Sequence, residues 1–433
     1  MSSNGQTLGE KILSRAAGHR VNAGQFVDVE PDWAFMVDDT VGAVLNYLAA
    51  AGITRVRHPD RIALFYDHFA PADNASNDGD QRRGREFSSS VGIRNFFDVG
   101  SGISHQVAVE KGLVRPGQVA FNADSHTTTL GAVGCFGTGL GAAEMAYVWA
   151  TGRIWLRVPA TIRVDVTGTL QQGVDAKDAV LSLLGAVGAR AATYRAIEYH
   201  GEAIGRVDMA SRMTFCNMGV EMGAKVAFVP VDAITLAHFA ALGIAVDADA
   251  GRPDDNAVYE RRIALDLNAV SPMVACPPRV DNVLPVRELG TVPIHQAFLG
   301  SCTNGRLEDL RRAAAILKGR RVAPGVRMIV TPASRDVYRA AIKEGVLEVL
   351  ADAGCVITSP GCGPCAGLHM GVLGDGETCI SSANRNFVGR MGSRDSLVYL
   401  GSPATVAASA VLGRIADERE LGAVSLQSPV STV

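Results

Sequence analysis

The sequence predicts an α/β protein with more than one domain. The chain has 433 residues, more than a single hydrophobic core usually accommodates. Short apolar runs typical of strands, at residues 62–66, 119–121 and 296–300, are separated by segments of helical periodicity. Hydrophobic residues form 47% of the chain and charged residues 20%, which is ordinary for a globular protein.

The composition excludes several functional classes. The formal net charge is -3, so no global basic field favours nucleic acid or an anionic membrane. The polar start lacks a signal-peptide pattern, and no apolar run reaches the ~20 residues that span a membrane. Eight scattered cysteines suit reduced thiols better than a disulfide framework. We therefore expect a cytoplasmic protein without membrane or nucleic-acid partners.

The first third of the chain predicts helices at residues 8–18 and 38–51, and a solvated helix within residues 77–90. The strand at residues 62–66 delivers Asp67 and His68 at its carboxyl end, where catalytic side chains of open α/β sheets collect.

Two further histidines follow in separate loops. His105 lies in a glycine-bracketed loop, and the strand at residues 119–121 leads into Asp124, Ser125 and His126. A single histidine is more often a hydrogen-bonded core or loop residue, but three loops with histidines, two beside an aspartate, favour a site. The glycine-rich tract at residues 131–143 lacks the dinucleotide-binding pattern.

The middle third begins near residue 159 with an alternating strand at residues 162–168, followed by a helix at 175–187. A second predicted helix, at residues 216–224, places Asn217 and Glu221 four residues apart on one face. From spacing alone, a solvent-facing pair is an equally good interpretation. The proline-containing residues 272–285 predict a linker.

The last third alternates again between predicted strands and helices, with helices at residues 307–317, 334–344 and 402–420 and a strand at 328–330. The domain boundaries that we expect are residues 1–158, 159–282 and 283–433.

Cys362 and Cys365 lie three residues apart in a loop rich in glycine and proline, a spacing typical of metal or redox centres. Zinc requires four ligands, a redox dithiol only two, and an iron–sulfur cluster normally four cysteines. Cys302 precedes the helix at 307–317, whose N-terminus favours a thiolate. The alternative interpretation is that Cys302 serves only as a small buried hydrophobic residue. Arg385 and Arg390 predict an anion clamp rather than surface ion pairs.

These motifs together resemble the aconitase superfamily. The matching segments are residues 301–306 (SCTNGR), 361–365 (GCGPC), 382–390 (SANRNFVGR), and, in the same order as in the family, 67–68 (DH), 105–106 (HQ) and 124–127 (DSHT). The resemblance covers nearly the whole chain and is closest to the large subunits of two-subunit 3-isopropylmalate dehydratases and homoaconitases.

The resemblance implies a three-domain core of α/β domains around a [4Fe–4S] cluster, without the swivelling fourth domain. Cys302, Cys362 and Cys365 would hold the cluster and leave one iron open to a substrate hydroxyl and carboxylate. His68 would be the acid, oriented by Asp67, and Arg385 and Arg390 would bind substrate carboxylates. The remaining implied site residues are His105, Asp124, Ser125, His126, Asn217, Glu221 and Asn384.

The implied activity is that of a hydro-lyase, which isomerises a hydroxy di- or tricarboxylic acid through dehydration and rehydration. The favoured reaction interconverts 3-isopropylmalate and 2-isopropylmalate in leucine biosynthesis; homocitrate, a methyl-branched malate or a specialised-metabolism analogue are alternative substrates. The family's base lies in the missing domain, so we expect a separate small subunit and an inactive chain alone. Asp38, where relatives have His or Gln, would change the charge beside the substrate.

Two other classes remain open at this point. One is an iron–sulfur sensor or RNA-binding regulator, which the net charge disfavours. The other is a structural zinc protein that uses Cys302, Cys362, Cys365 and a histidine. Visible absorbance together with iron and sulfide analysis separates these classes.

Overall fold

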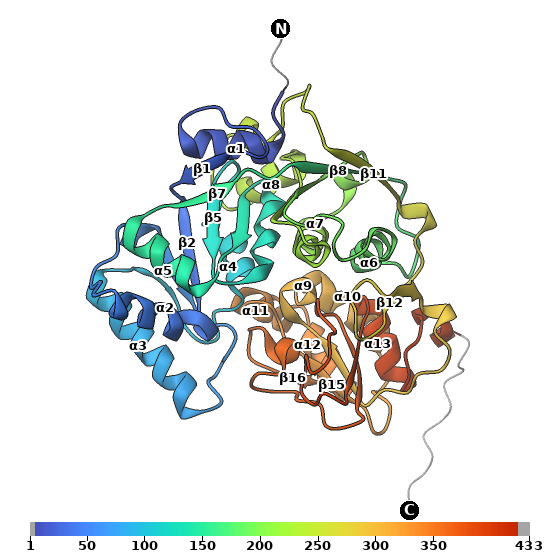
Figure 1. Cartoon of the computed structure of the whole chain (residues 1–433). Helices are drawn as coiled ribbons and strands as arrows, with labels where there is room; N and C mark the ends of the chain where they lie inside the picture. Colours follow the sequence, from blue (N-terminus) through green and yellow to red (C-terminus); the bar gives the residue numbers. More distant parts are fainter. Residues whose placement is uncertain (1–4, 423–433) are drawn as a thin grey trace, which may run out of the picture.

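The computed structural model describes residues 5–422 and contains three regions, each built on a β-sheet whose strands are mainly parallel (Figure 1). The first carries a five-stranded sheet in the order β4-β3-β2-β5-β6, with all neighbours parallel. An antiparallel pair, β1 and β7, lies beside it. The strands are β1 Phe26–Val29, β2 Trp33–Val37, β3 Ile62–Phe65, β4 Asn95–Phe97, β5 Val119–Asn122, β6 Phe136–Gly139 and β7 Ile154–Arg157.

Helices of this region are α1 Leu8–Ala17, α2 Asp38–Ala50, α3 Ala75–Val91, α4 Ser104–Glu110 and α5 Ala142–Thr151. A capping box between Thr7 and Glu10 starts α1, and Asn74 caps α3 through its side chain. Both helices end at a left-handed glycine, Gly18 and Gly92. The capping residues thus explain why these two predicted helices begin and end close to where the structure has them.

The second region has a four-stranded parallel sheet in the order β10-β9-β8-β11. Its strands are β8 Thr161–Thr167, β9 Ala196–His200, β10 Val226–Phe228 and β11 Arg261–Asp266. Its helices are α6 Ala176–Val187, α7 Met209–Asn217 and α8 Ala233–Ala241, and the 3-10 helix Met218–Met222 follows α7 directly.

The third region has a seven-stranded sheet in the order β13-β12-β18-β17-β14-β15-β16, antiparallel only at β12 and β13. The strands are β12 Met273–Ala275, β13 Val283–Pro285, β14 Gln296–Leu299, β15 Arg327–Val330, β16 Val356–Ile357, β17 Thr378–Ser381 and β18 Leu397–Leu400. The helices are α9 Ser301–Asn304, α10 Leu307–Leu317, α11 Arg335–Lys343, α12 Val346–Asp352 and α13 Pro403–Leu412.

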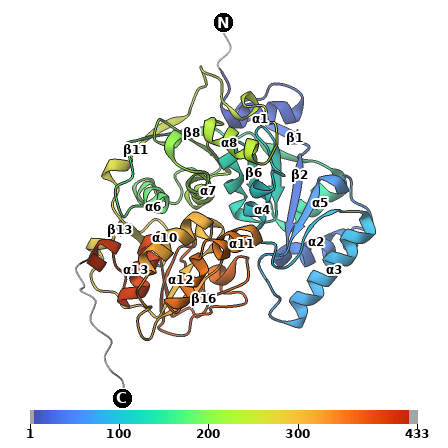
Figure 2. The same cartoon turned by 180° about the vertical axis from the view of Figure 1, so that it is seen from behind.

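The three regions share a continuous buried core. One apolar cluster includes Phe35 of β2, Val164 of β8 and Phe298 of β14, so the sheets are joined by packed side chains rather than by linkers alone. The view from behind shows the same three regions packed around a common centre (Figure 2). No helix within residues 5–422 is long and apolar enough to cross a membrane.

The α/β prediction is confirmed, with four local corrections. The loop predicted around His105 is the start of helix α4, and the helix predicted at 216–224 is a 3-10 helix after α7 ends at Asn217. The predicted linker contains β12 and β13, and the last predicted helix ends at Leu412. Short strands flanked by prolines gave too weak a pattern to predict. We keep the three-domain division as a proposal and start the third domain at β12, because β12 pairs with β13 and β18.

Candidate active site

The candidate site lies where the carboxyl ends of strands from two sheets face each other. Asp38 follows β2, Asp67 follows β3 and Asp124 follows β5 of the first sheet, while Cys302 follows β14 and Asn384 follows β17 of the third. Parallel strands bring their carboxyl ends to one edge of a sheet. Residues that are distant in sequence are therefore collected in one place, as the sequence predicted for Asp67 and His68.

Asp67 and His68 form a tightly held pair. The Asp67 carboxylate lies 2.7 Å from His68 Nδ1, and its other oxygen accepts the Ser104 backbone N–H, also at 2.7 Å. A carboxylate only accepts, so Nδ1 carries the hydrogen and Nε2 faces Asp124 Oδ2 at 3.4 Å. Although burial opposes the charged ring, Asp39, Cys362 and Asp67 raise the pKa of His68 well above its usual value.

Asp124 links two of the histidines. Its Oδ1 lies 3.0 Å from His105 Nε2 and accepts the His126 backbone N–H at 2.6 Å. Against the effect of burial, His105 and His68 hold the pKa of Asp124 well below its usual range. The Ser125 hydroxyl lies 3.2 Å from His126 Nδ1. Asp124 is thus an ionised carboxylate between imidazole rings.

The second region contributes Glu221, whose Oε1 lies 2.8 Å from both His126 Nε2 and Arg385 Nε. Burial alone would raise the pKa of Glu221, but His126 and Arg385 lower it below its usual value. A cavity of about 840 Å³ borders this group and is lined by Glu221, Arg385, Arg279 and Phe387, among others. Glu221 therefore connects the histidines to an arginine at the wall of an open cavity.

The three cysteines converge with two asparagines. Cys302 Sγ accepts the side-chain N–H groups of Asn217 at 3.1 Å and of Asn384 at 3.3 Å. The Cys365 thiol lies 3.7 Å from Asn384 Oδ1 and 3.4 Å from Arg390 Nη2. Cys362 packs in the same small apolar cluster as Cys302. None of the three forms a disulfide.

The backbone around the cysteines takes unusual conformations. Gly363, between Cys362 and Cys365, has φ 57°, and a Cβ there would lie 2.3 Å from the Thr331 hydroxyl. Ser301, before Cys302, is in the left-handed region at φ 72°, which non-glycine residues rarely adopt. Both conformations fix where the sulfurs point.

One expectation for Cys302 is wrong. The sequence predicted that a helix N-terminus would favour its thiolate, but burial raises the pKa of Cys302 to about 12. The cysteine lies inside the short helix α9 rather than at the start of α10. A buried thiolate here needs the positive charge of a bound metal centre.

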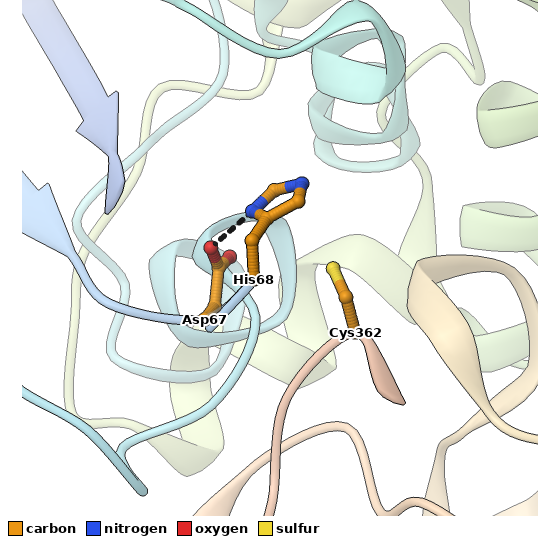
Figure 3. Close-up of side chains that lie close together, drawn as sticks. All are labelled: Asp67, His68 and Cys362. Carbon is orange, nitrogen blue, oxygen red and sulfur yellow. Dashed lines mark hydrogen bonds and ion pairs between the residues drawn. The ribbon is translucent and has the colours of Figure 1, made fainter. Parts of the chain in front are cut away.

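The donor set fits an iron–sulfur group. Three convergent thiols, two of them buried and in contact with N–H donors, are typical of iron–sulfur ligation. The remaining cysteines, Cys135, Cys216, Cys276, Cys355 and Cys379, lie elsewhere in the fold. Figure 3 shows Asp67, His68 and Cys362 approaching one another from two loops, with ligand atoms within 4.8 Å. The imidazole thus faces the sulfur side of the site.

Asp38, which the sequence predicted to lie beside the substrate, has its carboxylate occupied by backbone N–H groups. It is 3% exposed, and its oxygens accept the backbone N–H groups of Asp67, His68 and Phe69 at 2.9–3.1 Å. Both carboxylates lie near the His68 ring, Asp38 at 3.8 Å from Nδ1 and Asp39 at 3.9 Å from Nε2. Burial raises the pKa of Asp39 to about 6.

Sequence reasoning missed two residues near the site besides Asp39. His369, four residues after Cys365, has both ring nitrogens shielded and without a hydrogen-bond partner among the described residues, and its ring lies 6.5 Å from that of Phe69. Lys177 is fully buried at the start of α6. Two sequence signals could have indicated these residues. His369 follows the cysteine motif, and Lys177 is a charged residue within an otherwise apolar helix.

Three mainly parallel sheets, whose loops gather three thiols opposite a carboxylate–imidazole wall of Asp67, His68, His105 and Asp124, define an α/β protein with a candidate metal-binding site. The chain belongs to the Aconitase family (aconitate hydratase), whose sequence model matches residues 10–413. Membership of this family implies an iron–sulfur cluster.

Curated relatives match along almost their whole length. The chain is 50% identical over 415 residues to 3-isopropylmalate dehydratase large subunit 1 of Methanopyrus kandleri, covering 96% of this chain and 99% of that protein. It is 46% identical over 424 residues to the homoaconitase large subunit of Thermus thermophilus, covering 96% and 98%. Among solved structures, aconitase X of Thermococcus kodakaraensis matches with a TM-score of 0.48 and 13% identity over 84% of this chain and 85% of that one.

Proposed function

We propose that this chain is the large, cluster-bearing subunit of a [4Fe–4S]-dependent hydro-lyase. The observation that carries the proposal is the convergence of Cys302, Cys362 and Cys365 opposite the His68–Asp67 pair. The names of the relatives, 3-isopropylmalate dehydratase and homoaconitase large subunits, support the same activity.

Cys302, Cys362 and Cys365 would hold the cluster. When bound, a [4Fe–4S] group with three thiolate ligands supplies one open iron, a Lewis acid for a substrate hydroxyl. The side-chain N–H groups of Asn217 and Asn384 donate to the Cys302 sulfur and would hold it in position. Hydrogen bonds to sulfur also tune the electronic properties of such centres.

Arginines bind the substrate in this proposal. Arg385 uses Nε on Glu221, which leaves its terminal nitrogens for a carboxylate. Arg390 contacts Cys365 through Nη2, while its buried Nε lacks a partner among residues 5–422. Paired N–H groups of guanidinium match carboxylate geometry. One arginine beside the Cys365 sulfur and another at the cavity wall thus favour a dicarboxylate.

His68 is the proposed acid. Asp67 accepts the Nδ1 hydrogen, and in the charged imidazolium Nε2 carries a second proton, which the departing hydroxide would receive. The raised pKa of His68 keeps this proton in place at neutral pH. A hydrogen-bonded group of side chains would hold the His68 ring and the substrate in position. It consists of Asp124, His105, Ser125, His126 and Glu221.

A separate small subunit would complete the enzyme. The relatives are named as large subunits, which implies a partner, and we propose that the partner supplies the base for the carbon-bound proton. We place the enzyme in the cytoplasm.

The favoured substrate pair is 3-isopropylmalate and 2-isopropylmalate of leucine biosynthesis, because relatives of that name match at 44–50% identity. A homoaconitase is the second candidate, since relatives named homoaconitase match at 46%.

The test is a reconstitution. The chain is purified anaerobically, loaded with iron and sulfide, and assayed with and without its small subunit on isopropylmalate and homocitrate. We expect turnover only with both subunits, faster on isopropylmalate. Turnover by the chain alone would contradict the two-subunit proposal, and faster turnover of homocitrate would favour the second candidate.

A further inference from the structure

Lys177 is a lysine fully enclosed between the second and third regions. It is the second residue of α6, and its side chain has no exposed surface. Nζ donates to the backbone carbonyls of Ser382 at 2.9 Å and Ala383 at 2.7 Å. These are the two residues before Asn384, so Lys177 ties α6 to the loop that follows β17.

This ammonium group has no carboxylate partner. Among the described residues Lys177 bonds to the two carbonyls and forms no ion pair. The adjacent Asp178 uses its oxygens on the backbone N–H groups of Asp175 and Met273, each at 2.8 Å. Removing a charge from water without an opposite charge is costly, so the site needs an anion.

Thiolates at the cysteines would act on the charge of Lys177. Burial lowers the pKa of Lys177 to about 7, and Cys302 and Cys365 are the first groups that oppose this, ahead of Asp309 and Glu221. Both carboxylates are engaged elsewhere. Asp309 accepts from Asn304 and from the Arg306 backbone at 2.9 Å, and Glu221 pairs with His126 and Arg385.

The loop that Lys177 holds also contacts the sulfurs. The Ser382 hydroxyl accepts the Gly300 N–H at 3.0 Å and donates to the Gly300 carbonyl at 3.2 Å. Asn384 then places its amide against the sulfurs of both Cys302 and Cys365. Residues 382–384 are thus clamped between Lys177 on one side and the cysteine loops on the other.

We propose that Lys177 is a positioning residue for the iron–sulfur group, which fixes Asn384 against the sulfurs and offsets the negative charge of the thiolates. The inference rests on the proposed function, because it assumes that the three cysteines hold a cluster. A buried positive charge stabilises the reduced, more negative state of a centre. Removing it should make the reduction potential more negative and the cluster easier to lose.

Three variants separate charge from hydrogen bonding. Lys177→Gln keeps an N–H donor but removes the charge, and Lys177→Arg keeps the charge. Lys225→Gln is the matched control, because Lys225 is a half-buried lysine that donates to the Gly139 carbonyl of β6, outside the cysteine loops. The measurements are the midpoint potential by EPR-monitored titration, the rate of iron release to a chelator, and urea unfolding of the cluster-free chain.

We expect Lys177→Gln to have a more negative potential and roughly tenfold faster iron release, with Lys177→Arg and Lys225→Gln close to wild type. Equal potentials and release rates in Lys177→Gln and wild type would overturn the proposal, as would an effect confined to unfolding of the cluster-free chain. If Lys177→Gln does not fold, the midpoint potential of Lys177→Arg tests the proposal instead. A potential equal to that of wild type supports a role for the positive charge, and a shifted potential contradicts it. A wild-type chain that binds no sulfide would overturn the proposed function itself.

Discussion

The two sides of the candidate site differ in how their polar groups are satisfied. On the first-sheet side the imidazole rings pair with carboxylates of the chain: His68 with Asp67 at 2.7 Å, and His105 with Asp124 at 3.0 Å. On the third-sheet side the sulfur of Cys302 receives only amide N–H groups. Burial raises the pKa of that thiol, so the free chain provides no stable thiolate there.

This difference indicates which part of the site is complete before any cofactor binds. Hydrogen bonds and ion pairs of the folded chain hold the carboxylate–imidazole wall, and of its histidines His105 keeps a buried Nδ1 without a hydrogen-bond partner among the described residues. The thiol side acquires its charge only together with a metal group. Variants of the wall should therefore spare the cluster, and variants of the thiol side should lose it.

The largest effect is expected for Cys365→Ser. A serine oxygen is a poor replacement for a thiolate ligand of an iron–sulfur group, so iron, sulfide and turnover should fall to background. Iron and sulfide analysis of the reconstituted variant measures this. Cys355→Ser is the control, since Cys355 precedes β16 outside the site, and it should retain the cluster. A Cys365→Ser chain that keeps full sulfide would refute the ligand assignment.

His68→Ala should lower turnover on the order of 10²- to 10⁴-fold, the usual contribution of a positioned acid. His68 belongs to the carboxylate–imidazole wall, whose side chains are held by hydrogen bonds within the chain. The iron and sulfide contents of the variant should therefore match those of wild type. His58→Ala is the matched control: His58 lies 3.6 Å from Glu30 at the surface and should not affect turnover. Full activity of the two-subunit enzyme with His68→Ala would exclude His68 as the acid.

Asn384→Ala tests the donors on the thiol side. Loss of the N–H to Cys302 should accelerate iron release roughly tenfold to hundredfold, while the cluster still assembles. Release to a chelator under anaerobic conditions gives the rate. Asn386→Ala, in the same loop with its amide on the Ala275 carbonyl at 3.3 Å, is the control. Equal release rates in the two variants would argue against a specific role for Asn384.

The smallest effect concerns Asp39, whose pKa burial raises from 3.8 to about 6. Between about pH 4 and 6 the folded chain keeps a proton that the unfolded chain has released, so wild-type stability falls as the pH rises through this window. The Asp39→Asn variant has no carboxyl group at this position, so its stability does not fall for this reason. Relative to wild type, the variant should gain stability from about pH 4 to pH 7, as measured by urea unfolding. A constant difference across this range would be inconsistent with the raised pKa.

Much of the fold followed from local sequence patterns, whereas most candidate site residues came from the resemblance to a family. The apolar run before Asp67, the glycines around Cys362 and the helix at Leu307–Leu317 each carry their own signal. The roles of Asp38 and Asp39 did not, because adjacent carboxylates are equivalent in sequence and only the backbone N–H groups of residues 67–69 distinguish them. Likewise, Glu221 meets His126 across a 3-10 turn, which helical spacing could not predict.

The most direct measurement of the central claim is metal and sulfide analysis of the wild-type chain after anaerobic reconstitution, read together with its visible absorbance. We expect iron and acid-labile sulfide in equal amounts, about four of each per chain, and their loss in Cys302→Ser. Stoichiometric zinc without sulfide, bound through cysteines and a histidine such as His68, would contradict it.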